Sequence, residues 1–177
     1  MTALDDLHRE MGRFLTESSH LENLMMLYVA VTTQRSFPDV IVDFMGNPFG
    51  DKIKDFKKVH KAHAFSDEHR KILEEVYFEL DLLLPKRNFI VHGSTHELFT
   101  KDKAKQWYRI GMARGDADYF VQAFKENLTG PHVFTTAGIV AVTDECIALR
   151  KKLDDVTTEM LAGLNTKVAE MLQQPRS

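Results

Sequence analysis

The regular spacing of apolar residues over positions 136–168 is the feature that most constrains this chain. Apolar side chains recur there at alternating intervals of three and four residues, at Ile139, Val142, Cys146, Leu149, Leu153, Val156, Met160, Leu164 and Val168. This spacing puts them on one face of a long helix, as a seam against other helices or another subunit, and Thr135 or Thr136 is expected to cap it. The same period recurs over residues 3–34 and 66–84. The sequence therefore predicts a mostly α-helical protein.

The segments between these helices also carry local signals. Ser18-Ser19 leaves open whether residues 3–34 form one helix or two in tandem. Phe37-Pro38 begins a stretch rich in glycine and proline, where a loop is expected. Residues 51–63 then carry apolar side chains on one side, which predicts a short amphipathic helix. Ser66 is a suitable N-cap for the helix that follows.

Residues 97–135 do not show the helical period. Tyr108 and Ile110 alternate with other neighbours, Arg114-Gly115-Asp116 is a turn signal, and Tyr119-Phe120-Val121 follows. Alternation next to a turn is typical of a β-hairpin. We therefore expect a small hairpin before the last helix.

Composition narrows the class of protein. With 44% hydrophobic and 28% charged residues, the chain has the balance of a globular protein, and a single domain over residues 1–177 is expected. Its one cysteine, Cys146, excludes an internal disulfide framework and a four-cysteine zinc site. Acidic residues near the start do not fit a signal peptide, and no apolar run approaches the roughly 20 residues that span a bilayer. A cytoplasmic protein with no membrane contact is therefore expected. The net charge of −3 argues against indiscriminate polyanion binding, although basic residues are in local excess over 50–115.

A proline divides the third long helical segment. Pro85 lacks a backbone donor and disfavours a helical residue before it, so a kink or a restart is expected there. The continuation over residues 85–92 is expected to be a short helix with Gly93 as its C-terminal cap.

This short helix contains the most informative motif, Arg87-Asn88-Phe89-Ile90-Val91-His92-Gly93. Asn88 and His92 are four residues apart and share a helix face, whereas Arg87 lies about 140° away from His92 around the axis. An antiparallel dimer would bring the arginine and histidine of each copy to one cleft.

An arginine, an asparagine, three apolar residues, a histidine and a glycine at the end of a core helix resemble the HEPN superfamily, the "higher eukaryotes and prokaryotes nucleotide-binding" domain. The order of the expected elements is similar over most of the chain. The resemblance implies an all-α fold: an up-and-down bundle of four to five helices with the hairpin as an insert, dimerising along the motif helix. For many members it also implies metal-independent endoribonuclease activity in toxin–antitoxin or other defence systems, with an antitoxin or nucleotidyltransferase partner. Other members are inactive or bind nucleotides.

The resemblance assigns roles to three residues. Arg87 would stabilise charge on the scissile phosphate of RNA through its planar guanidinium. His92 would transfer protons, as imidazole does near neutral pH, and Asn88 would orient the phosphate or the histidine. The implied reaction is attack of a ribose 2′-hydroxyl on the adjacent phosphate, with no metal or other cofactor. Some toxins of the family carry a regulated tyrosine two residues after the histidine, where this chain has Ser94, so that regulation is not expected.

Four lysines follow helical spacing on the polar side of the 51–63 helix, namely Lys54, Lys57, Lys58 and Lys61. One interpretation is an electrostatic rail for an RNA backbone. The other is an ordinary solvated helix face.

Other interpretations of the motif and the histidines stay open. An arginine and a histidine in the last turn of a helix can simply cap free carbonyls. His96 is expected in a surface loop. His60 and His63, or Glu17-x-x-His20, are partial metal-site patterns, but surface histidines explain them more simply and no metal is expected. The alternative function is a non-catalytic HEPN module that binds a nucleotide or a partner protein.

Overall fold

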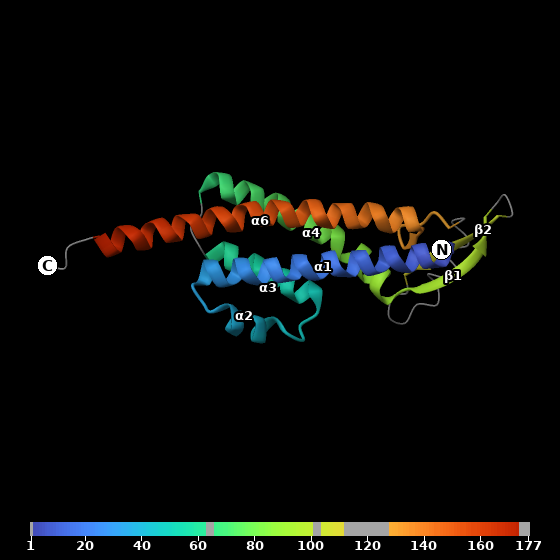
Figure 1. Ribbon diagram of the computed structural model, residues 1–177, viewed down its shortest axis with the longest axis horizontal. Helices are drawn as coiled ribbons and strands as arrows, with labels where there is room; N and C mark the ends of the chain where they lie inside the picture. The colour runs from blue at the N-terminus through green and yellow to red at the C-terminus, as the bar shows by residue number, and fades with distance from the viewer. Residues whose placement is uncertain (1, 63–65, 101–103, 112–127, 174–177) are drawn as a thin grey trace. The chain divides into compact units, whose positions relative to one another are not determined.

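The computed structural model describes residues 2–62, 66–100, 104–111 and 128–173, and for residues 60–62 and 164–173 it describes the backbone alone. These residues form helices α1 (Ala3–Thr33), α2 (Phe37–Phe44), α3 (Phe49–Ala62), α4 (Asp67–His92) and α6 (Thr136–Gln173), and strands β1 (Ser94–Phe99), β2 (Lys105–Ile110) and β3 (Val133–Phe134) (Figure 1). The prediction of a mostly helical protein with a small β insert before the last helix is confirmed. Within the described ranges, no helix has the length and apolar character that crossing a membrane requires.

The first part of the chain contains a helix that the sequence pattern did not predict. α1 continues through Ser18, whose side chain is buried, so the tandem alternative does not apply. The loop expected at Phe37-Pro38 is wrong, because α2 begins there. Ser36 caps α2 by accepting a hydrogen bond from the Asp39 N–H at 3.3 Å. The proline lies in the first turn, where a missing donor breaks no helical hydrogen bond.

The start and the end of α4 are as predicted, but the expected break at Pro85 is not found. Ser66 caps the helix by accepting a hydrogen bond from the His69 N–H at 3.2 Å. The helix then runs through Pro85 to His92, so the separate helix expected over 85–92 is wrong. A proline removes one donor from the helical ladder, and the buried apolar residues of the flanking turns hold the helix together around it.

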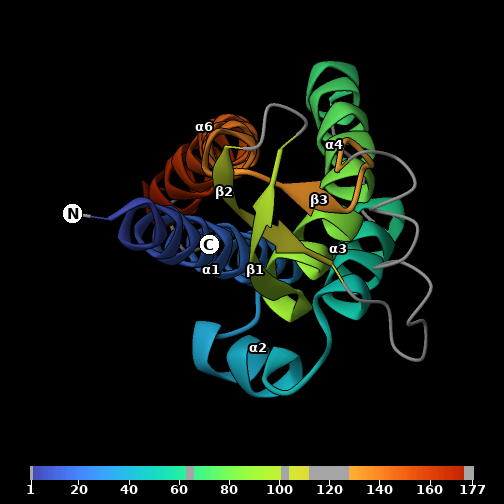
Figure 2. The same ribbon diagram turned by 90° about the vertical axis from the view of Figure 1, so that its right-hand side faces the viewer.

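The three strands form an antiparallel sheet in the order β1-β2-β3 (Figure 2). In the hairpin, Ser94 pairs with Ile110 and Phe99 pairs with Lys105. The segment of Tyr108 and Ile110 is a strand as predicted, but its hairpin partner precedes it in the chain. The predicted turn at 114–116 and strand at 119–121 lie outside the described residues.

α6 begins where its sequence predicts. Thr135 is the cap, because its Oγ1 accepts a hydrogen bond from the Gly138 N–H at 3.1 Å. The predicted seam is buried from Ile139 to Val156. The side chains of 164 and 168, the last two seam positions, lie outside the described residues.

The chain divides into two compact units, each with its own core. The first comprises residues 1–20 and 80–148, and it holds the sheet, the end of α4 and the beginnings of α1 and α6. Its core includes Leu7, Phe14, Leu80, Leu83, Ile90, Ile110, Ile139 and Val142. The second comprises residues 21–79 and 149–177. There the Phe56 ring makes edge-to-face contacts with Tyr28 and Tyr77, at centroid distances of 4.9 and 5.2 Å. The single-domain organisation stays a prediction.

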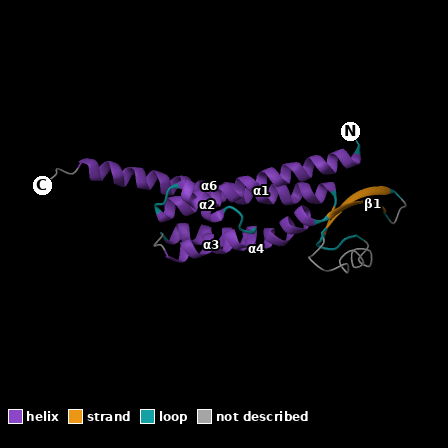
Figure 3. Cartoon of the chain, turned by 90° about the horizontal axis from the view of Figure 1, so that it is seen from below, coloured by secondary structure: helices purple, strands orange, loops and turns teal. Residues whose placement is uncertain are grey.

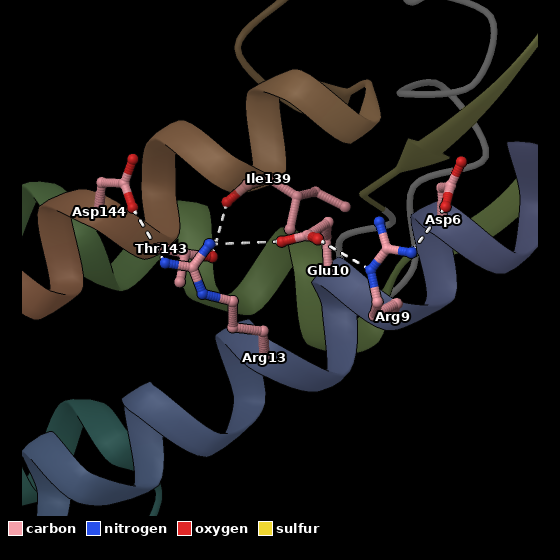
Figure 4. A network of polar contacts seen from close by, with 7 residues as sticks. All are labelled: Asp6, Arg9, Glu10, Arg13, Ile139, Thr143 and Asp144. Atoms are coloured by element: carbon pink, nitrogen blue, oxygen red, sulfur yellow. Dashed lines mark hydrogen bonds and ion pairs between the residues drawn. The ribbon is translucent and has the colours of Figure 1, made fainter.

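Polar contacts in the first unit join α1 and α4 to the beginning of α6. The Arg13 guanidinium lies 3.4 Å from Asp144 of α6 and 3.6 Å from Glu10 of its own helix (Figure 4). The Lys86 ammonium of α4 lies 2.6 Å from Glu145. Such solvated pairs contribute little stability one by one. The Lys86 pair does show which side of α4 is turned toward α6.

Candidate functional site

The end of α4 separates the three motif residues around the helix. Arg87 follows Leu83 by four residues and precedes Ile90 by three, so it lies on the face that carries the core residues. Its side chain is half-buried, whereas Asn88 and His92 are both exposed. The structure therefore brings Asn88 and His92 together on one face and places Arg87 on the core side of the same helix.

A second arginine, which the sequence did not single out, lies at the end of α4. Arg109 of β2 donates from Nε to the Ile90 carbonyl at 2.8 Å and from Nη2 to the Val91 carbonyl at 3.1 Å. Its Nη1 donates to Thr95 Oγ1 at 3.2 Å. The last carbonyls of a helix lack partners within the helix, and the negative end of the helix dipole attracts a cation. Arg109 thus caps α4 from the sheet, and its partial burial lowers the pKa of its guanidinium.

Two glycines allow the sheet to approach the helix end this closely. A β-carbon on Gly93 would overlap the Ile110 carbonyl oxygen and lie 2.6 Å from the Phe89 carbonyl oxygen. A β-carbon on Gly111 would lie 2.5 Å from Cβ of Phe89 and would overlap its ring. The helix ends at Gly93 as predicted, and its N–H donates to the Phe89 carbonyl at 3.0 Å. The physical reason for the glycine is close backbone approach.

This arrangement bears on the simplest interpretation of the motif, in which Arg87 and His92 only cap the helix. The carbonyls of Phe89, Ile90 and Val91 are already engaged by the Gly93 N–H and the Arg109 side chain. Within the part of the chain that the structure describes, the side chains of Asn88 and His92 make no hydrogen bond or ion pair. Both are therefore presented to solvent on a helix end that other groups hold in place.

His96 lies in a strand, so the loop expected for it is wrong. The pairing of β1 with β2 includes His96 opposite Tyr108, and the imidazole is half-buried. Its Nε2 lies 2.6 Å from the Ser94 Oγ, two residues earlier on the same side of the strand. Ser94 is thus engaged by a neighbouring imidazole.

The lysines of α3 are partly neutralised by their own helix. The Lys54 ammonium lies 2.8 Å from Asp51, and the Lys58 ammonium lies 2.7 Å from Asp55. The hydrogen bond with Asp51 raises the pKa of Lys54. These pairs reduce the net positive charge that the helix face presents.

The other two lysines of the predicted rail are Lys57 and Lys61. The Lys57 ammonium lies 5.8 Å from the ring centroid of Tyr77, and the side chain of Lys61 lies outside the described residues. α3 belongs to the second unit and the motif to the first. An RNA-binding role for these lysines stays a prediction.

Metal-binding patterns gain no support from the described residues, where no group of three or more His, Cys, Asp or Glu side chains is arranged to hold an ion. The imidazole of His20 lies 3.9 Å from Glu17 on the same helix. Cys146 is buried in α6. The side chains of His60 and His63 lie outside the described residues.

Sequence reasoning missed Arg109 because no spacing links it to the motif. The alternation of Trp107, Arg109 and Gly111 indicated one face of a strand. It carried no information about what that face would meet. The contact depends on β2 returning antiparallel to β1, which brings Arg109 back to the end of α4.

Comparison with protein-family models, curated proteins and solved structures finds no match for this chain. The interpretation of the α4 end therefore depends on its geometry and on the motif.

Proposed function

We propose that this protein is a metal-independent endoribonuclease of the HEPN type. The observation that supports the proposal is that Asn88 and His92 are exposed at the end of α4. Arg109, and not these two residues, caps that helix end. An imidazole that is exposed on a rigid element, with no capping duty, is available to give and take protons.

The proposed reaction is an internal transesterification of RNA. The ribose 2′-oxygen attacks the adjacent phosphorus, and the bond from phosphorus to the 5′-oxygen breaks. One imidazole accepts the proton of the 2′-hydroxyl, and a protonated imidazole gives a proton to the departing 5′-oxygen. A guanidinium stabilises the charge on the phosphate. The products are a cyclic phosphate and a free 5′-hydroxyl, and no metal is required because the nucleophile is part of the substrate.

A homodimer along α4 would supply the two histidines. Leu82 is 51% exposed and Pro85 is exposed, and His92 follows Pro85 by seven residues, which is about two helical turns. Apolar side chains exposed beside polar site residues are typical of an interface. A Leu82→Asp variant is expected to sediment as a monomer, whereas a matched Leu15→Asp variant on α1 is expected to sediment as the parent does.

The test of catalysis is an RNA cleavage assay in excess EDTA. His92→Ala is expected to lower the rate about 10²–10⁴-fold, the usual contribution of a proton-transfer group. His8→Ala, at an exposed position of α1, is the matched control and is expected to keep the parent rate. Arg87→Ala, assayed alongside, tests whether its guanidinium serves the reaction. A parent protein that leaves mixed RNA intact contradicts the proposal.

The position of Arg87 on the core side of α4 favours a second candidate, a non-catalytic HEPN module that binds a nucleotide or a partner protein. In that case the parent binds a nucleotide in a calorimetric titration, or co-purifies with a partner, and does not cleave RNA. A toxin role further predicts an antitoxin or nucleotidyltransferase encoded next to this chain.

A further inference from the structure

Among the described residues, one face of the β1–β2 hairpin carries a small apolar core, and the other meets the end of α4 at Arg109 and is exposed at Phe99. Successive side chains of a strand point to opposite faces of a sheet. One face carries Tyr108 and Ile110, against which Leu98, Leu128 and Val133 pack. The other face, here named the outer hairpin face, is formed by Thr95, Glu97, Phe99, Lys105, Trp107 and Arg109. Figure 3 shows the hairpin extending away from the end of α4.

Two aromatic rings lie on the outer hairpin face. Phe99 is 66% exposed, which is high for a large apolar side chain in a strand. Trp107 is half-buried, and it is the chain's single tryptophan. A ring left in water adds nothing to a core, and exposed aromatic side chains on strands are the surfaces on which unpaired bases stack.

Cations on the same face match a phosphate backbone. Lys105 pairs with Phe99 across the strands, and its ammonium lies 5.8 Å from the centroid of that ring. Arg109 adds a second positive charge at the other end of the face. Glu97 is the one acidic residue among the six, and its contact with Lys105 at 3.2 Å is solvated. Solvated ion pairs are weak, so a phosphate can compete for the ammonium.

We propose that the outer hairpin face binds single-stranded RNA. Bases stack on Phe99 and Trp107, and phosphates lie beside Lys105; the choice of RNA as the ligand rests on the proposed function. The face is continuous with the motif, because Arg109 holds the last-turn carbonyls of α4 and His92 is the final residue of that helix. An RNA strand that follows the face from Phe99 toward Arg109 therefore leads to His92. Duplex RNA does not fit this mode, since its bases are already stacked on one another.

The test uses the full chain and an oligouridine with 2′-O-methyl groups, which lacks the nucleophile and so cannot be cleaved. Stacking on the single tryptophan is expected to quench its fluorescence to saturation. Phe99→Ala is expected to weaken binding about tenfold, the contribution of one base–aromatic stack. Phe78→Ala is the matched control, because Phe78 is 64% exposed on α4, and it is expected to bind as the parent does. Lys105→Gln is expected to reduce the salt dependence of log Kd by about one unit.

The inference is overturned if the parent does not bind, if a folded Phe99→Ala binds as the parent does, or if a blunt duplex binds equally tightly. Unchanged tryptophan fluorescence alongside binding seen by anisotropy would also overturn it, because the RNA would then lie elsewhere. The methylated oligouridine reports binding without cleavage, so the two proposals fail separately. If binding depends on Phe99 but unmodified RNA is not cleaved, the ribonuclease proposal is refuted and RNA binding by the outer hairpin face is supported. Cleavage with a KM insensitive to Phe99→Ala refutes the surface and leaves the nuclease standing.

Discussion

The end of α4 and the lysine-bearing face of α3 are both candidate sites in the sequence, but their polar side chains have different surroundings in the structure. On α3, Lys54 and Lys58 each meet an aspartate of the same helix three residues away. At the end of α4, a residue from another element satisfies the helix carbonyls, and the side chains of Asn88 and His92 point to solvent. The lysines of α3 are thus paired within their own helix, whereas the end of α4 is capped by a residue of β2.

This difference teaches how to separate a site from a solvated surface. Charged residues at helical spacing commonly pair along their own helix, and such pairs are weak and carry no information about a ligand. At the end of α4, by contrast, a distant residue caps the helix and the polar residues of its last turn stay exposed. The sheet, through Arg109, Gly93 and Gly111, is what makes the α4 end different from the α3 face.

Adding a side chain at Gly93, where α4 and the sheet are in close contact, should have the largest effect on stability. Gly93→Ala puts a methyl group against two carbonyl oxygens, neither of which can move without shifting a strand or a helix end. We expect a loss of about 3 kcal/mol in the free energy of unfolding, measured by urea denaturation. Gly12→Ala in α1, where a new methyl group meets nothing within 4 Å, is the control and should stabilise by about 0.5–1 kcal/mol. Equal effects at both glycines would show that the sheet does not hold the helix end.

Removing the cap should have an intermediate effect. Arg109→Ala leaves the carbonyls of Ile90 and Val91 without their charged donor, and we expect a loss of about 1–2 kcal/mol in the same measurement. Arg109→Lys should recover only part of this loss, because an ammonium cannot reproduce the fork of donors. Arg70→Ala, at an exposed position of the same helix, should change stability by less than about 0.5 kcal/mol. A parent-like Arg109→Ala would return the capping role to the motif residues.

The α3 face should show the smallest effect. Because each ammonium already contacts an aspartate on a solvated helix face, we expect the double variant Lys54→Gln, Lys58→Gln to unfold close to the parent's urea midpoint, with any difference screened by salt. Its affinity for the methylated oligouridine should stay within about twofold of the parent, since paired lysines neutralise few phosphates. A large drop in affinity would instead support the electrostatic rail on α3.

Much of the fold could be predicted where the structure of a segment depends on its own residues. The seam of α6, its threonine cap, the Ser66 cap of α4 and the helical end at Gly93 all follow from spacing and local chemistry. The wrong predictions were those in which a proline was expected to break or exclude a helix. Pro38 starts a helix and Pro85 is carried inside one, because the consequence of a proline depends on whether its missing donor was needed.

The candidate site was predictable only in part. The four-residue spacing of Asn88 and His92 placed them on one face, as the structure shows. The spacing also put Arg87 elsewhere around the helix, but it could not say which side would meet the core. His96 was assigned to a loop because the strand pairing that orders it spans the hairpin turn.

By itself, the sequence determined that this chain would be helical, where most helices would begin, and which two motif residues would share a face. These properties depend on neighbours within a few positions, and the periods of helix and strand express them directly. Only the tertiary structure decided that Arg87 turns toward the core and that Arg109 caps α4. The same level of structure decided that the strand face carrying Arg109 meets the end of α4. Such contacts join residues far apart in the chain, and their geometry exists only once helix and sheet have packed together.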